Sequence, residues 1–168
     1  MAERRQRGQP FVRHAYRAQH AAQVGGGADA RLRALDADQR RMETTINEFA
    51  TLLAANKGIG VFYYSGHGLQ VDGENYLIPI NAAITDETDV KYKAIDVGQV
   101  LGKMEAAKNN LNIVILDAGR VNPWLRGRGN HYRGLATMQA HGTLIAYATA
   151  PNSTASDGNE EDTNGLYT

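Results

Sequence analysis

The sequence contains no cysteine in its 168 residues. Without thiols the chain can form no disulfide, no thiolate metal site and no nucleophilic thiolate. Neither sign of charge is in excess, because 18 Lys and Arg residues balance 18 Asp and Glu residues. Apolar runs fall short of the roughly 18–20 residues that span a bilayer, and the N-terminus lacks the apolar centre of a secretory signal. These absences predict a cytoplasmic chain with no nucleic-acid partner and no membrane partner.

Two regions of the chain differ in composition, with a change near residue 42. Residues 1–41 hold nine of the thirteen arginines, no lysine and only scattered apolar residues. No run of four apolar residues in this region predicts a buried strand, so we expect an irregular Arg-rich arm. The abrupt junction also fits a shifted reading frame or a rearranged gene. A basic arm that contacts phosphates is the alternative, although it has few interleaved aromatic residues.

Regular apolar spacing begins at Met42. The residues from there on predict an amphipathic helix that ends near Lys57 and Gly58. Its apolar positions are Met42, Ile46, Phe49, Leu52 and Leu53. A second helix is predicted after Asp96, whose carboxylate suits an N-cap. Its inward positions are Val97, Val100, Leu101 and Met104.

Short apolar runs predict three buried strands, at residues 59–64, 111–116 and 143–148. A small hairpin is predicted from residues 69–71 and 75–80, around a glycine-containing turn. Residues 120–142 and 151–165 have the composition of loops. The order of strand, helix, strand, loop and strand predicts an α/β fold with a mostly parallel sheet and helices on both faces. We expect one folded domain over residues 42–168.

Polar and glycine-rich segments follow two of these strands at the point where each strand ends. Ser65-Gly66-His67-Gly68 follows the first, and Asp117-Ala118-Gly119-Arg120 follows the second. Because the working residues of parallel sheets lie beyond the carboxyl ends of the strands, both segments are predicted to belong to one site. His67 lies 52 residues before position 119 (119 − 67). A histidine about 50 residues upstream of the nucleophile is typical of the caspase pattern.

Four stretches together resemble a known family, the bacterial caspase-like cysteine peptidases of the metacaspase and orthocaspase type. They read GVFYYSGHG at 60–68, NYLIPI at 75–80, NIVILDAGR at 112–120 and GTLIAYATAP at 142–151. The resemblance spans about residues 38–168. It implies a caspase-like fold, in which a mostly parallel, Rossmann-like sheet carries helices on both faces. It also implies the activity of a cysteine endopeptidase.

The resemblance further implies roles for individual residues. His67 matches the catalytic general base, and position 119 matches the nucleophile, for which the family has cysteine. The backbone N–H groups of Gly68 and of position 119 would form the oxyanion hole, whose donors stabilise developing negative charge. Ser65 and Asp117 match a pocket that selects Arg or Lys before the scissile bond, since a carboxylate favours a basic partner. The implied partner is a peptide or protein substrate with basic residues.

The sequence departs from the family at three places. Gly119 stands where the cysteine belongs, and neither Ala118 nor Arg120 offers a nucleophile. The apolar first strand of the family is not visible in residues 1–41, and its closing elements are not visible before Thr168. We therefore expect an incomplete caspase-like domain that is inactive as a peptidase. The alternative is a non-catalytic pseudoenzyme that binds peptides or scaffolds a partner.

No cofactor is predicted. Four acidic residues offer hard oxygen ligands without the spacing of a calcium-binding loop. They are Asp157, Glu160, Glu161 and Asp162. The resemblance implies calcium only weakly, because some metacaspases need it. Candidate activation-cleavage sites in the long loop are Arg126, Arg128 and Arg133.

Overall fold

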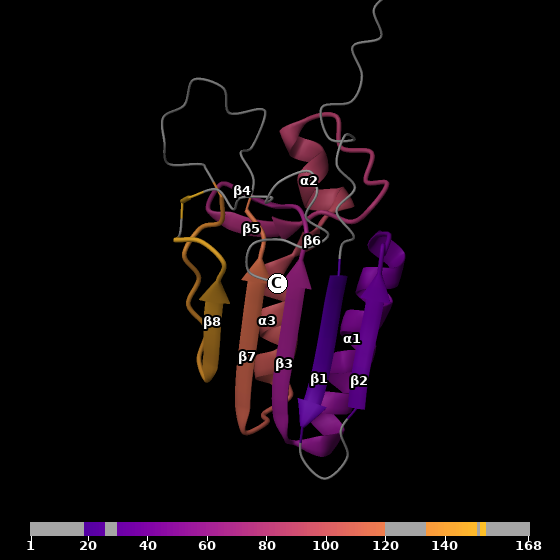
Figure 1. The fold of residues 1–168 in the computed structure, drawn as a ribbon, viewed down its shortest axis with the longest axis vertical. Coiled ribbons are helices and arrows are strands. Elements are labelled where there is room, and N and C mark those ends of the chain that lie inside the picture. Colours follow the sequence, from indigo (N-terminus) through magenta and orange to yellow (C-terminus); the bar gives the residue numbers. More distant parts are fainter. Residues whose placement is uncertain (1–18, 26–29, 120–133, 151, 154–168) are drawn as a thin grey trace, which may run out of the picture.

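A five-stranded sheet and a smaller three-stranded sheet organise the fold (Figure 1). The computed structural model describes residues 19–25, 30–119, 134–150 and 152–153. The strands are β1 (Gln19–Gly25), β2 (Ala30–Leu35), β3 (Ile59–Ser65), β4 (Gly68–Val71), β5 (Glu74–Leu77), β6 (Ile95–Asp96), β7 (Leu111–Asp117) and β8 (Thr143–Tyr147). The helices are α1 (Gln39–Asn56), α2 (Glu87–Lys93) and α3 (Val97–Ala106). The alternation of helices and strands confirms the predicted α/β class.

The large sheet has the strand order β2-β1-β3-β7-β8. Strands β3, β7 and β8 run parallel, whereas β1 runs antiparallel to both β2 and β3. The parallel half consists of the three strands predicted from apolar runs, and each begins and ends within one residue of its prediction. The sheet is therefore mixed, and its parallel half carries the polar strand ends.

Helices α1 and α3 begin and end at residues that their capping chemistry favours. The Asp38 carboxylate accepts a hydrogen bond from the backbone N–H of Arg41 at 2.8 Å, which satisfies a free amide of the first turn of α1. Lys57 ends α1 in the left-handed conformation, with a φ of 54°. Asp96 caps α3 by accepting from the backbone N–H of Gly98 at 2.7 Å. The predicted stop of the first helix and the predicted cap of the second are both confirmed.

One face of the large sheet carries the main hydrophobic core. Phe62 and Tyr64 on β3, like Val114 and Leu116 on β7, alternate along their strands and are at most 1% exposed. Helices α1 and α3 pack against one another over this face, where the rings of Phe49 and Phe62 have centroids 6.5 Å apart. Burying a large apolar side chain contributes roughly 1.5–3 kcal/mol, so this layer is the main source of stability.

The opposite face of β3 and β7 has no helix among the described residues. Its side chains Val61, Tyr63, Ile113 and Ile115 are half-buried. Both long helices lie on the core face (Figure 1). Helix α2 instead packs Val90 into the cluster under the small sheet. The expectation of helices on both faces is therefore not met in the part of the chain that the structure describes.

Strands β1 and β2 correct the prediction of an irregular arm over residues 1–41 for the part that the structure describes, residues 19–25 and 30–35. The two strands form an antiparallel hairpin within this region, and β1 also pairs with β3 along its whole length. On β2, Leu32 and Ala34 pack against the core while Arg33 is exposed. Backbone pairing on both sides of β1 makes a long apolar run unnecessary, because strand formation depends on neighbours more than on intrinsic preference. A strand thus occupies the place beside β3, and it runs antiparallel to β3.

Strands β4 and β5 form the predicted hairpin. The turn residues Asp72 and Gly73 have φ values of 53° and 85°, and two positive values are what a type I′ turn requires. The register pairs Gln70 directly with Asn75. These two polar side chains are buried, at 3% and 1% exposure. Residues that face one another across a ladder share a face, so the hairpin presents both amides on one side.

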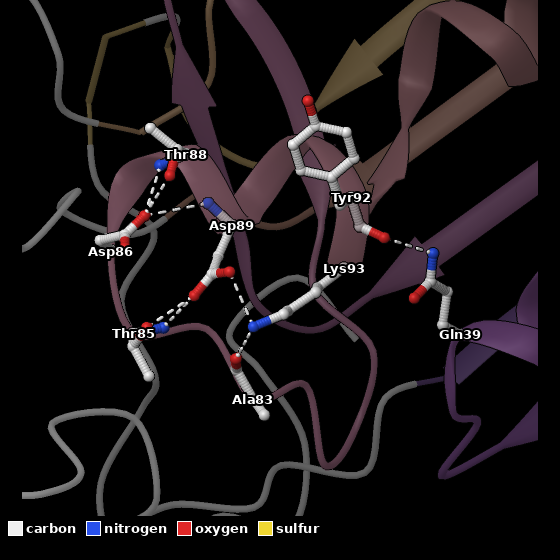
Figure 2. Close-up of polar contacts among 8 residues, drawn as sticks. All are labelled: Gln39, Ala83, Thr85, Asp86, Thr88, Asp89, Tyr92 and Lys93. Atoms are coloured by element: carbon white, nitrogen blue, oxygen red, sulfur yellow. Dashed lines mark hydrogen bonds and ion pairs between the residues drawn. The ribbon is translucent and has the colours of Figure 1, made fainter.

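Helix α2 has no counterpart among the predicted elements, and a polar network holds it (Figure 2). The Asp86 carboxylate caps it by accepting from the backbone N–H groups of Thr88 and Asp89 at 2.9 and 3.1 Å. Asp89 accepts from the backbone N–H of Thr85 at 2.8 Å and pairs with Lys93 at 2.7 Å. Acidic residues in the first turn and basic residues in the last complement the helix dipole. That charge pattern was the available sequence signal.

Candidate active site

Two strand ends meet at one edge of the large sheet. Strands β3 and β7 are parallel neighbours, and their register pairs the final residues Ser65 and Asp117. The backbone N–H of Gly66 donates to the Asp117 carbonyl at 3.1 Å, which extends the contact one residue past the strand. The structure thus brings together the segments that follow β3 and β7, as far as Gly119.

Tyr64 holds the backbone of the segment that follows β3. Its buried hydroxyl group lies 2.9 Å from the His67 carbonyl oxygen and 3.1 Å from the Ile78 carbonyl oxygen. The Ile78 N–H donates to the same His67 carbonyl at 2.8 Å. Burial raises the pKa of Tyr64, so the phenol keeps its proton and remains a donor at neutral pH. These bonds fix His67 through its main chain, and its side chain is half-buried.

Two glycines of this segment stand where the neighbouring atoms crowd a side chain. A Cβ at Gly66 would lie 2.7 Å from the Tyr64 hydroxyl oxygen, well inside van der Waals contact. A Cβ at Gly68 would lie 3.0 Å from the Ala118 Cβ and 3.3 Å from the Leu135 Cδ2. Glycine at both positions therefore lets the segment pack against the chain that follows β7.

Ser65 and Asp117 contact one another at the paired strand ends. The Ser65 Oγ donates to the Asp117 Oδ2 at 3.3 Å. Asp117 is 9% exposed and Ser65 is half-buried. A largely desolvated carboxylate beside a hydroxyl is suited to bind a cationic group through charge-assisted hydrogen bonds. The two residues of the predicted pocket therefore lie side by side.

Position 119 has a backbone conformation that suits glycine, with a φ of 139°. A Cβ built there would lie 3.3 Å from the Gly134 Cα and 3.6 Å from both the Leu135 nitrogen and the Ser153 carbonyl oxygen. Residues 134–135 and Ser153 thus form a wall beside position 119, which we call the 119 wall. Glycine carries no reactive group, so the residue at this position offers no nucleophile.

Two buried amides that the sequence pattern does not single out contact the segments of the 119 wall. The Asn75 Nδ2 donates to the Ala136 carbonyl at 2.8 Å, and its Oδ1 accepts from the Ala136 N–H at 2.7 Å. The Gln70 Nε2 donates to the Asn152 Oδ1 at 3.1 Å, and the Asn152 N–H donates to the Leu135 carbonyl at 2.9 Å. Asn75 opens the NYLIPI stretch that resembles the family, but neither amide was assigned a role from the sequence.

Several residues singled out from the sequence lie outside the described residues. They are Arg120, Arg126, Arg128, Arg133, Asp157, Glu160, Glu161 and Asp162. In the ranges that the structure describes, no three side chains of the metal-binding types come together. No described helix is long and apolar enough to cross a bilayer. A cavity of about 550 Å³ lies between the start of α1 and residues 79–83, and none of the candidate site residues lines it.

Comparison with known proteins points to a family. The family model of the caspase domain matches residues 28–168. Two curated proteins are similar to the chain, the mucosa-associated lymphoid tissue lymphoma translocation protein 1 of Homo sapiens and its homolog from Mus musculus. Each is 30% identical over 87 residues. The matches cover 51% of this chain and 10% of each relative, so the chain corresponds to a small part of those proteins.

Proposed function

The chain belongs to the caspase-domain family of cysteine peptidases, and from that premise we propose that it binds peptides with Arg or Lys before the scissile bond and does not cleave them. The family acts on peptides or proteins. What we propose for this chain is the preference for basic residues. The observation that carries it is the 3.3 Å contact between Ser65 and Asp117 at the paired strand ends. Asp117 supplies negative charge, and Ser65 supplies a hydroxyl, for a guanidinium or ammonium group.

Gly119 stands, in this proposal, at the place of the missing nucleophile. In a cysteine peptidase a thiolate attacks the scissile carbonyl carbon after histidine has taken the thiol proton, and that proton then goes to the leaving amine. Gly119 has no atom for this attack, and the chain contains no cysteine elsewhere. Removing the nucleophile of a serine protease costs roughly 10⁶-fold in turnover. We therefore expect no useful peptidase activity from the chain.

The remaining groups of the proposed site position a peptide. His67 would serve as the base toward a thiol at position 119. The backbone N–H groups of Gly68 and Gly119 would donate to the carbonyl oxygen of the bound peptide bond. The close packing of Gly68 on Ala118 supports this pairing, because it brings the two donor segments into contact. None of these roles needs a metal or another cofactor, so cofactor-free binding is part of the proposal.

Binding is tested by calorimetry with a peptide that ends in arginine and with the same peptide ending in citrulline, its neutral analogue. We expect the arginine peptide to bind more tightly. Asp117→Asn should weaken its binding by on the order of tenfold or more, because hydrogen bonds to charged groups are the strong ones. Asp72→Asn, which removes an exposed carboxylate from the β4–β5 turn, is the control and should leave the affinity unchanged.

Two outcomes would contradict this proposal. In the first, the arginine and citrulline peptides bind equally well. In the second, Asp117→Asn binds the arginine peptide as tightly as the parent chain does. Either result would mean that the carboxylate of Asp117 does not recognise a basic side chain of the peptide.

Peptidase ancestry is tested separately with Gly119→Cys. We expect the parent chain to cleave no fluorogenic substrate. The variant should cleave such substrates after Arg or Lys but not after Asp. Adding His67→Ala to Gly119→Cys should abolish the restored activity, because the thiol then lacks its base. If Gly119→Cys binds the arginine peptide and still does not cleave it, the peptidase roles of His67 and position 119 are contradicted and the binding function alone remains.

A further inference from the structure

We propose that Asn75 and Gln70 are positioning residues of this site. They clamp residues 134–136 and 152–153 against position 119 and thereby set the space beside it. The inference rests on the proposed function only in taking position 119 as the place of the nucleophile. The clamp itself is a statement about contacts and can be tested without a peptide.

Asn75 forms the stronger half of the clamp. Its amide makes both possible hydrogen bonds with the main chain of Ala136, at 2.8 Å from Nδ2 to the carbonyl and 2.7 Å from the N–H to Oδ1. Asn75 and Ala136 are both buried. A buried main-chain group that loses its partner has no water to replace it, so this pair resists opening. Asn75 binds Ala136 much as a neighbouring strand would, in a stretch where the described chain has no strand.

Gln70 forms the second half and holds the other segment. It lies opposite Asn75 in the hairpin ladder, and its Nε2 donates to the Asn152 Oδ1 at 3.1 Å. The Asn152 N–H donates in turn to the Leu135 carbonyl at 2.9 Å. Two segments that are far apart in sequence are therefore tied to one hairpin and to one another.

The clamped segments reach the site directly. A Cβ at Gly134 would collide with the Ser153 carbonyl oxygen, so the two segments touch there. The same residues come within 3.3–3.6 Å of a Cβ built on Gly119. Leu135 also comes within 3.3 Å of a Cβ built on Gly68, the proposed oxyanion donor. A continuous path of contacts thus leads from the β4–β5 hairpin to both sides of the proposed reaction centre.

Because the chain contains no cysteine, a cysteine introduced at position 119 can serve as a reporter of solvent access. Gly119→Cys introduces the only thiol of the chain, and its alkylation rate with iodoacetamide measures access past the 119 wall. Asn75→Asp replaces the Nδ2 donor by a carboxylate oxygen that repels the Ala136 carbonyl. Adding Asn75→Asp should raise the alkylation rate by on the order of tenfold, because a weakened clamp opens locally more often. The neutral Asn75→Ala and the isosteric Gln70→Glu should act in the same direction.

Two controls separate opening of the wall from loss of stability. Asn112→Asp alters another buried asparagine, at the amino end of β7, and should leave the alkylation rate of Gly119→Cys unchanged. Ala107→Cys places the single thiol in the main core instead, and Asn75→Asp should leave its alkylation slow.

The outcomes are decisive in both directions. Faster alkylation at position 119 alone supports the clamp. An unchanged rate at position 119 in all three clamp variants overturns it, and so does an equal increase at positions 119 and 107, which would make Asn75 and Gln70 merely structural. Failure of the arginine peptide to bind, together with faster alkylation at position 119, would reject the proposed function and keep the clamp.

Discussion

At the scale of single residues, the position of the Tyr64 hydroxyl leaves room only for glycine at position 66. Tyr64 is one of the most buried side chains. The Tyr64 hydroxyl already bonds the carbonyls of His67 and Ile78, so it cannot move aside without losing both contacts. We predict that Gly66→Ala lowers the free energy of unfolding by roughly 1–3 kcal/mol, as overpacking a tight site does. Urea denaturation followed by circular dichroism measures the change.

Gly102→Ala is the matched control for this prediction. Gly102 lies within α3, and a Cβ built there meets nothing within 4 Å. Alanine should therefore raise the free energy of unfolding by about 0.4–1 kcal/mol, by reducing the freedom of the unfolded chain. If both alanine variants changed stability in the same direction, the close contact between Gly66 and Tyr64 would not be the cause.

In the proposed function, position 119 combines a chemical and a conformational obstacle to catalysis. The sequence shows the chemical one, since glycine has no thiol. The structure adds that a φ of 139° and the nearby Gly134 Cα leave a side chain little freedom. A cysteine introduced at position 119 must shift its own backbone or the 119 wall. For this reason the clamp residues and the nucleophile are best varied together.

At the scale of elements, helix α2 makes a pH-dependent contribution to stability. Lys93 and, next, Thr85 lower the pKa of Asp89 well below its ordinary value of 3.8. A carboxyl group with a lowered pKa in the folded state contributes stability above its unfolded pKa and loses it as the pH falls through the folded value. We predict that the urea midpoint of the parent chain falls on acidification below about pH 4. Asp89→Asn should make this fall shallower.

Glu48→Gln is the charge-matched control for Asp89→Asn. It removes an exposed carboxylate of α1 and changes the net charge by the same amount. The acid-induced fall in this variant should match that of the parent chain. If the midpoints of all three proteins fell in parallel, other carboxyl groups would account for the acid sensitivity and Asp89 would not.

At the scale of the whole molecule, the hairpin of β1 and β2 completes the large sheet. β1 pairs with β3 over seven register positions, and β2 places Ala34 in the core under α1. We predict that deleting residues 1–36 exposes the β3 edge and abolishes cooperative unfolding, because an unpaired edge favours aggregation. Deleting residues 1–18 alone should keep the cooperative transition. Differential scanning calorimetry and size-exclusion chromatography measure both.

Cooperative unfolding without residues 1–36 would support the prediction that residues 1–41 form an irregular arm. If the chain without residues 1–36 unfolded as cooperatively as the chain without residues 1–18, the hairpin would contribute nothing to the fold. The folded domain would then begin near residue 42, as the composition alone indicates.

Much of the fold was predictable because local rules govern it. Apolar runs predicted β3, β7 and β8, the glycine-containing turn predicted the β4–β5 hairpin, and Asp96 predicted the start of α3. The strands β1 and β2 were not predictable in this way. Their stability comes from pairing with distant segments, and nothing in their own composition reports that pairing. Helix α2 was missed because it is short and its signal lies in charges rather than in apolar spacing.

The sequence by itself determined the family, the class of fold and the absence of a thiol nucleophile. The family follows from the resemblance of four stretches and from the match to the caspase-domain model. The fold class follows from local periodicity, and the lack of a thiol follows from residue identity. None of the three needs knowledge of distant contacts. Only the tertiary structure decided that Ser65 and Asp117 touch, that the main helices share one face and that β1 lies antiparallel to β3. It alone also showed that Asn75 bonds Ala136 and that Gln70 bonds Asn152, the residues next to the 119 wall. Such contacts join residues tens of positions apart, and only the packing of the folded chain brings them together.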